Sequence, residues 1–501
     1  APLISANIHR VLGPEPDSLH IHQAQVLAAI NLLRDLREGL VTFDVNGEPA
    51  PGQAEAWQVL DDGRRYRFML RADARWSNGD PVTADDFVRA WRRAFTPATT
   101  AATVGLLKAV RNADDILAGR MEPAALGIRA DGPGVVEIEL NQAAPWLLEI
   151  LAHPVAFPLH VTAVEDPRKA PVNGPFLVEE WTPRASIKLV RNPLYHAAAS
   201  VAPDVVIYYP IEEPATELAL YRAGELHITE TIPAGRFSWL QDNLPADLRI
   251  HPYLGSFWLG LNLNHPVLGS SRDLRRALAL AINRDILAQT VLGAGEVAGW
   301  SVVPPDMSGY VPAAMLESGL SQAAREAEAQ RLYRRANLGQ NGSLLLELRY
   351  NTSAVHRRVA VAVAAMWKQV LGINTELVNE EWKVFVNNRK MGVVTQVFRG
   401  GWIADYADPS SFLELFSGGS ALNNTFYRNT RFDELLGSAN AEVGAARMEL
   451  LRRAESQLMQ DMPVIPLYYY VSRHLVNPAI AGFENNVRDI HLSRYLDLGS
   501  D

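Results

Sequence analysis

Two aspartates lie three residues apart in RGGWIADYADPSSFLELF (residues 399–416), and their carboxylates suggest two kinds of chemistry. Asp408 precedes a proline and a helical run, so we expect it to cap that helix and to have a structural role. Asp405 lies between Trp402 and Tyr406, where no helix needs a cap, and its neighbours suggest partial burial. A buried carboxylate needs a cation. This segment alone leaves open whether Asp405 binds one or is an ordinary loop residue.

Aromatic residues are frequent at turn-rich places in the chain. Trp402 adjoins Gly400 and Gly401, whose missing side chains would allow the backbone of a ligand to approach closely. Aromatic residues lie in cores more often than in sites, so both interpretations stay open for the whole set: Tyr253, Trp258, Trp382, Trp402, Tyr406 and Tyr468 to Tyr470.

Patterns typical of catalysis or metal binding are missing from the sequence. The chain has no cysteine, which excludes thiol catalysis, zinc–thiolate sites, iron–sulfur clusters and disulfides. His20 and His22 are two residues apart and fit neither a helical HExxH pair nor a zinc spacing. The glycines of residues 293–299 miss the dinucleotide-binding pattern, and neither a GxSxG elbow nor a Walker A sequence occurs. We therefore expect no metal and no cofactor, and enzymatic activity has no support.

Length and charge narrow the class of protein further. A chain of 501 residues predicts two or three domains. With 47 basic and 56 acidic residues and a net charge of -9, it has no general basic surface for nucleic acid or an anionic membrane. No apolar run reaches the roughly 18 residues of a membrane span. The sequence starts at Ala1 without a signal-like segment, so we expect a mature chain whose export signal has been removed.

Secondary-structure patterns predict mixed α and β structure. Residues 42–95 alternate short strands with Asn-Gly and Asp-Gly turns and then enter a helix that Thr83 and Asp86 should cap. Residues 343–351, 354–371 and 373–378 predict a strand, a helix and a second strand, hence a parallel βαβ unit whose strand ends can form a ligand crevice.

Further helices are expected between the predicted strands. The helix of the βαβ unit should bury one face and stop at Gly372; the residues of that face are Val355, Val359, Val363, Met366 and Val370. A long helix is expected at about 271–291, from Ser271 to Gly293, and another at about 322–337. No linker-like stretch separates domains, so several chain crossings should connect them.

Segments spread over nearly the whole chain resemble one family in the expected order. They are REGLVTFDVNGEPAPGQAEAW, YRFMLRADARWSNGDPVTADDFVRAWRR, VNGPFLVEEW with RNPLYH, YNTSAVHRR, NEEWKVF, RGGWIADY and IPLYYYV. On these segments the chain resembles the extracytoplasmic solute-binding proteins of ABC importers, in the oligopeptide-binding branch of the peptide/nickel family.

The resemblance implies an α/β, bilobal periplasmic-binding-protein fold (type II-like) with an extra inserted α+β domain, three domains in all. Lobe I would combine residues 1–30, 153–254 and 472–501. The inserted small domain would span residues 31–152, and lobe II residues 255–471. The lobes would close about a hinge around an extended peptide.

The resemblance also implies roles for individual residues. Asp405 matches the aspartate that pairs with the α-ammonium of the bound peptide. The peptide main chain would bond in strand-like fashion to the backbone of Gly400, Gly401, Trp402 and Ile403, and this affinity would not depend on side chains. Roomy, hydrated pockets would take the peptide side chains between Tyr253, Trp258, Trp382 and Trp402.

Arg399, Arg389 and His356 match positions that bind the peptide carboxylate at different peptide lengths. His356 has independent support, because Asn351 ends a strand and His356 lies in the first turn of the next helix, where the dipole favours an anion. The alternative is a solvated helix residue. We expect Asn351 to take part in ligand binding as well.

The chain departs from the resemblance at several positions. Gly255 and Ile403 stand where some members carry a cysteine pair, so a disulfide is lost. Glu230 falls near a position that is often Asn, and a more acidic wall there would favour basic peptides.

The function that follows is a receptor for short peptides that serves a membrane-embedded ABC permease. We expect a periplasmic monomer that is not an enzyme and binds no nucleic acid. A receptor for a murein-derived peptide or another amine-bearing solute is the alternative within the family. A peptide hydrolase would need a nucleophile or a metal, for which the sequence offers no candidate.

Overall fold

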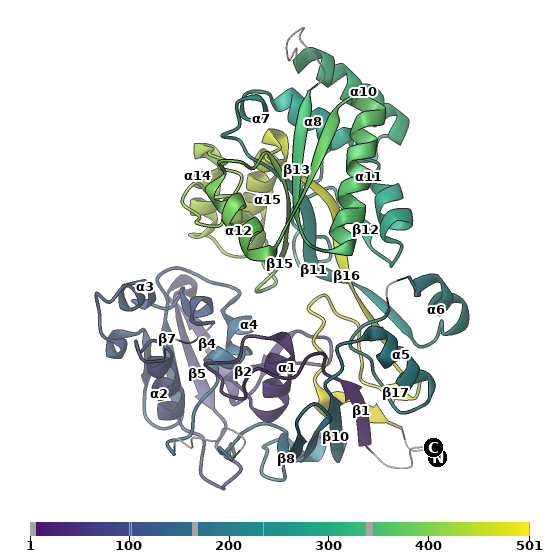
Figure 1. Cartoon of the computed structure of the whole chain (residues 1–501). Coiled ribbons are helices and arrows are strands. Elements are labelled where there is room, and N and C mark those ends of the chain that lie inside the picture. Colours follow the sequence, from purple (N-terminus) through teal and green to yellow (C-terminus); the bar gives the residue numbers. More distant parts are fainter. Residues whose placement is uncertain are drawn as a thin grey trace. The chain divides into compact units, whose positions relative to one another are not determined.

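The computed structural model describes residues 7–99, 101, 103–162, 169–233, 235–336 and 344–499 (Figure 1). Contacts divide the chain into two units, and the chain passes from one to the other twice. Unit 1 comprises residues 1–251 and 472–501, and unit 2 comprises residues 252–471. This division does not separate residues 31–152 from the rest of unit 1, and the three expected domains stay a prediction.

One four-stranded sheet of unit 1 packs against helix α1 (Leu27–Leu36). Its strand order is β1-β10-β9-β8, with β1 parallel to β10 and the other pairs antiparallel. Apolar side chains of α1 and of the sheet form a common core, which Leu32, Phe176 and Leu189 exemplify. The strands are β1 (Asn7–Val11), β8 (Phe176–Thr182), β9 (Ser186–Arg191) and β10 (Val205–Tyr209).

A second sheet of unit 1 is antiparallel and belongs to the first third of the chain, where alternating strands and turns predicted it. Its order is β4-β5-β7-β6. Helix α2 (Ala84–Ala94) packs against β6 and β7, and it begins with the expected capping box of Thr83 and Asp86. The strands are β4 (Ala54–Leu60), β5 (Arg65–Leu70), β6 (Ile128–Ala130) and β7 (Val135–Glu139).

Shorter elements complete unit 1. They are β2 (Val41–Phe43), β3 (Pro49–Pro51), α3 (Ala113–Leu117), α4 (Leu147–Leu151), α5 (Pro214–Arg222), α6 (Phe237–Asn243), β17 (Ile480–Ala481) and β18 (Asp497–Leu498).

The sheet of unit 2 has six strands in the order β12-β16-β11-β15-β13-β14. It is mixed: β13 is parallel to β14 and β15, and β11 is antiparallel to β15. In Figure 1, α10 and α11 lie on one side of this sheet, and α14 and α15 on the other. The strands are β11 (Leu248–Leu261), β12 (Val297–Ala298), β13 (Leu345–Asn351), β14 (Asn374–Glu380), β15 (Val397–Ile403) and β16 (Val464–Leu475).

The predicted βαβ unit is confirmed by β13, α11 (Ala354–Leu371) and β14. Helix α11 ends at Gly372, whose φ of +71° suits glycine. The buried face of α11 differs in part from the prediction: it runs through Val359, Val363 and Trp367. Trp367 turns inward because its indole N–H donates to the backbone oxygen of Leu278 over 2.9 Å.

The single long helix expected at 271–291 is wrong. Ser271 caps α8 (Arg272–Leu280) as expected, but the chain then leaves the helix. The Asn283 side chain accepts a hydrogen bond from Ile286 N over 3.1 Å, so Asn283 caps a new helix. That helix is α9 (Arg284–Ile286), which continues as a π-helical segment (Leu287–Leu292) and ends at Gly293.

The remaining helices of unit 2 include α10, which lies where a helix was expected at 322–337. They are α7 (Pro266–Ser270), α10 (Gln322–Ala336), α12 (Trp382–Met391), α13 (Ser410–Leu413), α14 (Thr430–Ala439) and α15 (Gly444–Asp461).

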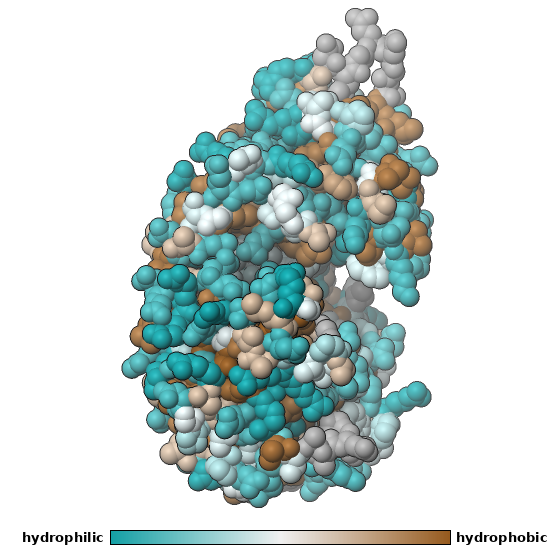
Figure 2. Space-filling view, turned by 90° about the vertical axis from the view of Figure 1, so that its left-hand side faces the viewer, coloured by the Kyte–Doolittle hydropathy of each residue, from teal (hydrophilic) through white to brown (hydrophobic). Residues whose placement is uncertain are grey.

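Hydrophilic residues cover much of the face in Figure 2, with hydrophobic residues scattered among them. In the part of the chain that the structure describes, none of the helices combines the length and the apolar character that crossing a membrane requires.

Candidate functional site

Strand β15 has a strand partner along only part of one of its edges. On the other edge it pairs with β11 over its whole length, from Val397 with Leu261 to Ile403 with Gly255. Strand β13 pairs with β15 only at Val397 and Phe398. Within the described residues, therefore, the stretch after Phe398 up to Ile403 has no ladder partner on the β13 side. An open strand edge presents backbone N–H and C=O groups that another extended chain can pair with.

The glycines of β15 make room for side chains of unit 2 itself. A Cβ at Gly400 would lie 2.3 Å from Nε1 of Trp258, whose indole is buried and packs edge-on against Phe416. A Cβ at Gly401 would lie 3.0 Å from the hydroxyl of Tyr470. The packing of Trp258 explains Gly400 without a ligand. A role of Trp258 as a pocket wall stays a prediction.

Asp408 belongs to a buried ion pair. Its carboxylate accepts hydrogen bonds from Nη1 and Nη2 of Arg447 over 2.6 and 2.9 Å, and the exposed fractions of the two residues are 3% and 0%. The expected contact with the helix start is also present, because Oδ1 of Asp408 accepts from Ser410 N over 2.9 Å. The contact with the helix start was predicted from the sequence, whereas the arginine, which lies 39 residues further along the chain, was not.

Asp405 is exposed, so the expected partial burial is wrong. It follows β15 directly, and its backbone N–H donates to Oγ of Ser411 over 3.2 Å, which ties this turn to the start of α13. Ile403, at the end of the strand, is exposed as well. Trp402 is half-buried, and its indole N–H donates to the same Ser411 hydroxyl over 3.3 Å. Asp405 therefore lies two residues beyond the end of the strand with the open edge.

The three predicted carboxylate-binding residues lie on α11, α12 and β15, and Asn351, which we expect to take part in ligand binding, ends β13. Each carries a buried polar atom without a hydrogen-bond partner in the described structure. These atoms are Oδ1 of Asn351, Nδ1 of His356, Nε of Arg389 and Nε of Arg399. Water or a ligand can supply the partner of such an atom, and other buried atoms of the described structure, Nε of Arg447 among them, share this lack of a partner.

The two arginines and the histidine pack on aromatic rings. The guanidinium of Arg399 lies 5.3 Å from the ring centre of Phe257, and the His356 ring lies 5.6 Å from the same ring. The guanidinium of Arg389 lies 5.2 Å from the ring centre of Phe385. Such stacking orients a guanidinium without neutralising it. No ion pair with an acidic residue is found for these three side chains within the described parts of the chain.

The charges of this group differ from the prediction at one residue. Burial and the nearby charge of Arg399 lower the pKa of His356 to about 4, so its imidazole is neutral at pH 7 in the empty protein. Burial lowers the pKa of Arg389 to about 10, which leaves it charged. The structure thus presents two permanent cations, and a histidine that becomes a cation only when an anion raises its pKa.

Three further predicted residues lie on α12, on β11 and in unit 1. Trp382 begins α12 and is 50% exposed, and Tyr253 is half-buried in β11. Glu230 belongs to unit 1, where its backbone N–H donates to Oε2 of Glu217 over 2.8 Å. Burial raises the pKa of Glu230 to about 7, so its carboxyl is partly neutral at neutral pH. This weakens the expectation that Glu230 favours basic peptides.

Gly255 of β11 and Ile403 of β15 are direct cross-strand partners. These are the two positions at which some members of the family that the sequence resembles carry a cysteine pair. A side chain on Gly255 would meet the ring of Tyr470 at 2.4 Å. In this chain the tyrosine occupies the space next to Gly255.

A cluster of His474, Asp489 and His491 in unit 1 was not predicted from the sequence. Oδ1 of Asp489 lies 2.8 Å from Nε2 of His474 and 3.0 Å from Nε2 of His491, close enough for a shared metal. Asp489 raises the pKa of His474 to about 9 despite burial, and Nδ1 of His474 bonds to the oxygen of Thr229. A protonated His474 donates from both nitrogens, so the cluster is a charged pair. The spacing of these residues in the sequence does not predict the cluster, because it is the fold that brings residues 474 and 489 together.

The open strand edge, the exposed carboxylate and the cations are features of a protein that binds an extended, doubly charged solute. Residues 48–424 match the model of bacterial extracellular solute-binding proteins, family 5, middle region. The periplasmic oligopeptide-binding protein OppA of Salmonella typhimurium is 36% identical over 482 residues, which cover 94% of this chain and 88% of OppA. The chain belongs to this family of bacterial extracellular solute-binding proteins.

Two further relatives show how far the similarity extends. The periplasmic murein peptide-binding protein MppA of Escherichia coli is 33% identical over 97% of this chain and 92% of MppA. A solved structure of MppA without ligand has a TM-score of 0.90, with 31% identity over 99% of this chain and 98% of that chain. The structure of Haemophilus influenzae OppA in complex with the peptide RPPGFSPFR has a TM-score of 0.78, with 30% identity over 99% of both chains.

Proposed function

We propose that the protein is a periplasmic receptor that binds short peptides in an extended conformation and delivers them to an ABC-type permease. It acts as a monomer and carries out no catalysis. The observation that supports this most is the open edge of β15, where the ladder to β13 ends at Phe398. The names of the relatives, which bind oligopeptides and murein peptides, favour the same class of ligand.

The peptide pairs with this edge as an added strand. Its main-chain groups bond to the backbone between Gly400 and Ile403, so binding does not depend on its side chains. Its α-ammonium pairs with the Asp405 carboxylate. Its carboxylate binds to Arg399 or Arg389, which have no acidic partner in the described structure, and His356 contributes when protonated.

Native mass spectrometry of the protein as purified tests this proposal. We expect a mixture of small peptides to leave the protein on activation, and the mass of the intact complex gives the number of protein chains. Recovery of peptides that contain murein-type amino acids would favour the alternative ligand class. Absence of any peptide, together with failure to bind added tripeptides, would contradict the proposal.

The absence of catalysis is tested with a labelled tripeptide incubated with excess protein. We expect the label to be recovered in the intact tripeptide. Hydrolysis at a rate that follows protein concentration and persists after a second purification would contradict a pure binding function.

A further inference from the structure

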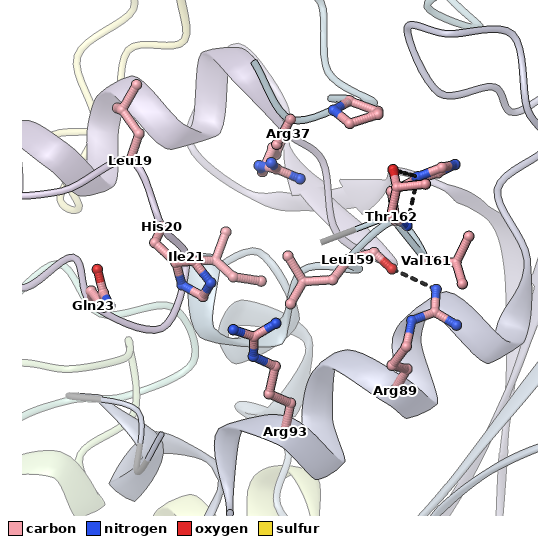
Figure 3. A pocket seen from close by; sticks show the side chains of 13 residues that line it. Leu19, His20, Ile21, Gln23, Arg37, Arg89, Arg93, Leu159, Val161 and Thr162 are labelled. Carbon is pink, nitrogen blue, oxygen red and sulfur yellow. Dashed lines mark hydrogen bonds between the residues drawn. The ribbon is translucent and has the colours of Figure 1, made fainter. Parts of the chain in front are cut away.

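Unit 1 contains a cavity lined by several basic side chains, with a volume of about 370 Å³ (Figure 3). Its basic and protonatable members are His20, Arg37, Arg89, Arg93 and His160. None of the described residues that line it is acidic. A cavity of this volume is large enough for a small molecule rather than a single ion.

Two of these basic side chains are already paired. Arg89 forms an ion pair with Asp86 and donates to the backbone oxygen of Leu159 over 2.7 Å. Nε2 of His160 lies 2.8 Å from Oδ2 of Asp80. These partners fix the positions of Arg89 and His160.

Arg37 and Arg93 differ from that pair. Arg37 is only 4% exposed, and its Nη1 is buried without a hydrogen-bond partner in the part of the chain that the structure describes. No ion pair of Arg37 or Arg93 with the described residues is found. Figure 3 shows both side chains at the cavity, Arg37 from the end of α1 and Arg93 from α2 on the opposite side.

The position of Arg37 makes this lack of a partner costly. Its backbone N–H donates to Leu33 O at the end of α1, so the side chain starts from a fixed point in the core. Burial lowers the pKa of Arg37 to about 10, which still leaves the guanidinium charged at neutral pH. The charges of Arg93 and Arg37 also contribute to lowering the pKa of His20 to about 4, after burial itself. Among the described residues the charge of Arg37 has no counter-ion, and an anion in the cavity would supply one.

The remaining walls determine what kind of anion fits. Leu19, Ile21, Leu159, Val161 and Pro171 are apolar, and Gln23 and Thr162 can hydrogen-bond. This lining suits a compact organic group attached to the charged one.

We propose that this cavity, the Arg37 pocket, binds a small molecule with a doubly charged oxyanion group. The oxyanion bridges Arg37 and Arg93 by charge-assisted hydrogen bonds, and its carbon skeleton packs against Ile21 and Leu159. A phosphate monoester carries such a group, and a dicarboxylate offers the same total charge on two carboxylates, one for each arginine. The Arg37 pocket lies wholly within unit 1, whereas the proposed contacts of the peptide termini belong to unit 2.

Titration calorimetry with inorganic phosphate, glycerol 3-phosphate and succinate tests the proposal and separates the two sources of oxyanion. We expect at least one of them to bind, and binding to persist in the presence of a saturating tripeptide. If none of the three binds, or if the tripeptide displaces the bound anion, the proposal of a separate oxyanion site is wrong.

Three variants distinguish a binding role from a structural one. Arg37→Met should weaken binding of the anion by roughly 10- to 100-fold and leave the melting temperature of the empty protein unchanged or higher, since it removes an unpaired buried charge. Arg93→Gln should also weaken binding. Arg92→Gln, one residue away on α2 and outside the cavity lining, is the matched control and should bind as the wild type does.

A structural role for Arg37 predicts the opposite pattern. Arg37→Met would then lower the melting temperature of the empty protein while Arg93→Gln left anion binding unchanged. That result, or an equal loss of binding in Arg92→Gln, overturns the proposal.

Discussion

The start of α13 and the open edge of β15 are separated by a few residues of chain, yet they treat charge in opposite ways. At α13, Asp408 and Arg447 are both buried and neutralise each other through two hydrogen bonds. Beyond β15, Asp405 is exposed, and within β15 Arg399 forms no ion pair with an acidic residue of the described structure, although the Nε atoms of Arg399 and Arg447 alike lack a partner there. The charges of Asp408 and Arg447 neutralise each other within the protein, whereas we expect Arg399 to find its counter-charge in a ligand.

Buried arginines elsewhere in unit 2 support the same distinction. Arg284 is completely buried, but its Nε donates to the backbone oxygens of Gly299 and Pro466 over 2.9 and 2.8 Å. Arg389 and Arg399 contact aromatic rings, and their Nε atoms have no such acceptor within the described residues. Substitution of a satisfied charge should therefore affect folding, and substitution of an unsatisfied one should affect binding.

The largest effect is expected for Asp408→Asn. An asparagine still accepts from Ser410 N, so the contact with the helix start is kept, but Arg447 is left as an uncompensated buried charge. Breaking a buried pair in this way costs about 3–5 kcal/mol of unfolding free energy. Urea unfolding followed by circular dichroism measures this loss.

This expectation replaces the one from sequence, in which Asp408 only caps a helix and Asn would serve equally well. The control is Asp405→Asn, which changes the same chemical group three residues earlier at an exposed position. Equal stability of the two variants would mean that the Arg447 pair contributes nothing and would remove the basis of the comparison.

The next largest effect is expected for Asp405→Asn, and it concerns binding. If the peptide α-ammonium pairs with Asp405 away from water, loss of the carboxylate costs about 2–5 kcal/mol, or roughly 30-fold to several thousand-fold in affinity. A pair that stays exposed to solvent contributes only about 0–1 kcal/mol. Titration calorimetry with a tripeptide separates these cases, and thermal stability of the empty protein should not change.

An N-acetylated tripeptide provides the matched ligand control. It should bind the wild type poorly, and Asp405→Asn should weaken it little further, because the ammonium is already missing. A loss of less than about fivefold for the free tripeptide would identify Asp405 as a solvated loop residue and refute the anchor.

Parts of the fold that depend on local rules were predictable from the sequence. The capping box of Thr83 and Asp86, the βαβ unit and its end at Gly372 each follow from a few neighbouring residues. The predicted helix at 271–291 failed at Asn283, where a single polar side chain restarts the helix. The spacing of apolar residues does not show where a polar side chain interrupts and restarts a helix.

For the candidate site, the identities of the residues were predictable from the sequence, but their burial, partners and charges were not. The candidate residues came from the resemblance. In the described structure four of them share one property, a buried polar atom without a hydrogen-bond partner: Asn351, His356, Arg389 and Arg399. The exposure of Asp405, the partner of Asp408 and the neutral state of His356 were beyond the sequence. The last two depend on groups far away along the chain, Arg447 for Asp408 and Arg399 for His356.

A smaller effect tests whether the unsatisfied cations recognise peptide length. Because the ammonium site is single and the cations come from different elements, Arg399→Gln and Arg389→Gln should weaken peptides of different lengths unequally, by about tenfold for the affected length. The measurement is a series of titrations with alanine peptides of two to five residues. Arg358→Gln, an exposed residue of α11, is the control and should bind all lengths as the wild type does.

The outcome that contradicts this assignment is a uniform one. If both variants lose the same factor for every length, the arginines act as a general positive field and do not bind the carboxylate individually.

The smallest effect is a pH dependence that comes from His356. Burial and Arg399 hold its pKa at about 4 in the empty protein, and a peptide carboxylate beside it would raise that value. Binding then takes up a proton, so the affinity of peptides that contact His356 rises as pH falls from 7 towards 5, by at most about tenfold per pH unit for one proton. Calorimetry in buffers of different ionisation enthalpy counts the protons directly.

His356→Gln is the control, because it keeps the charges of Arg399 and Arg389 and the titration of Glu230 while it removes the imidazole. We expect proton uptake in the wild type at pH 6 and less in the variant. Identical uptake in both proteins would place the peptide carboxylate away from His356 and leave the two arginines as its only partners.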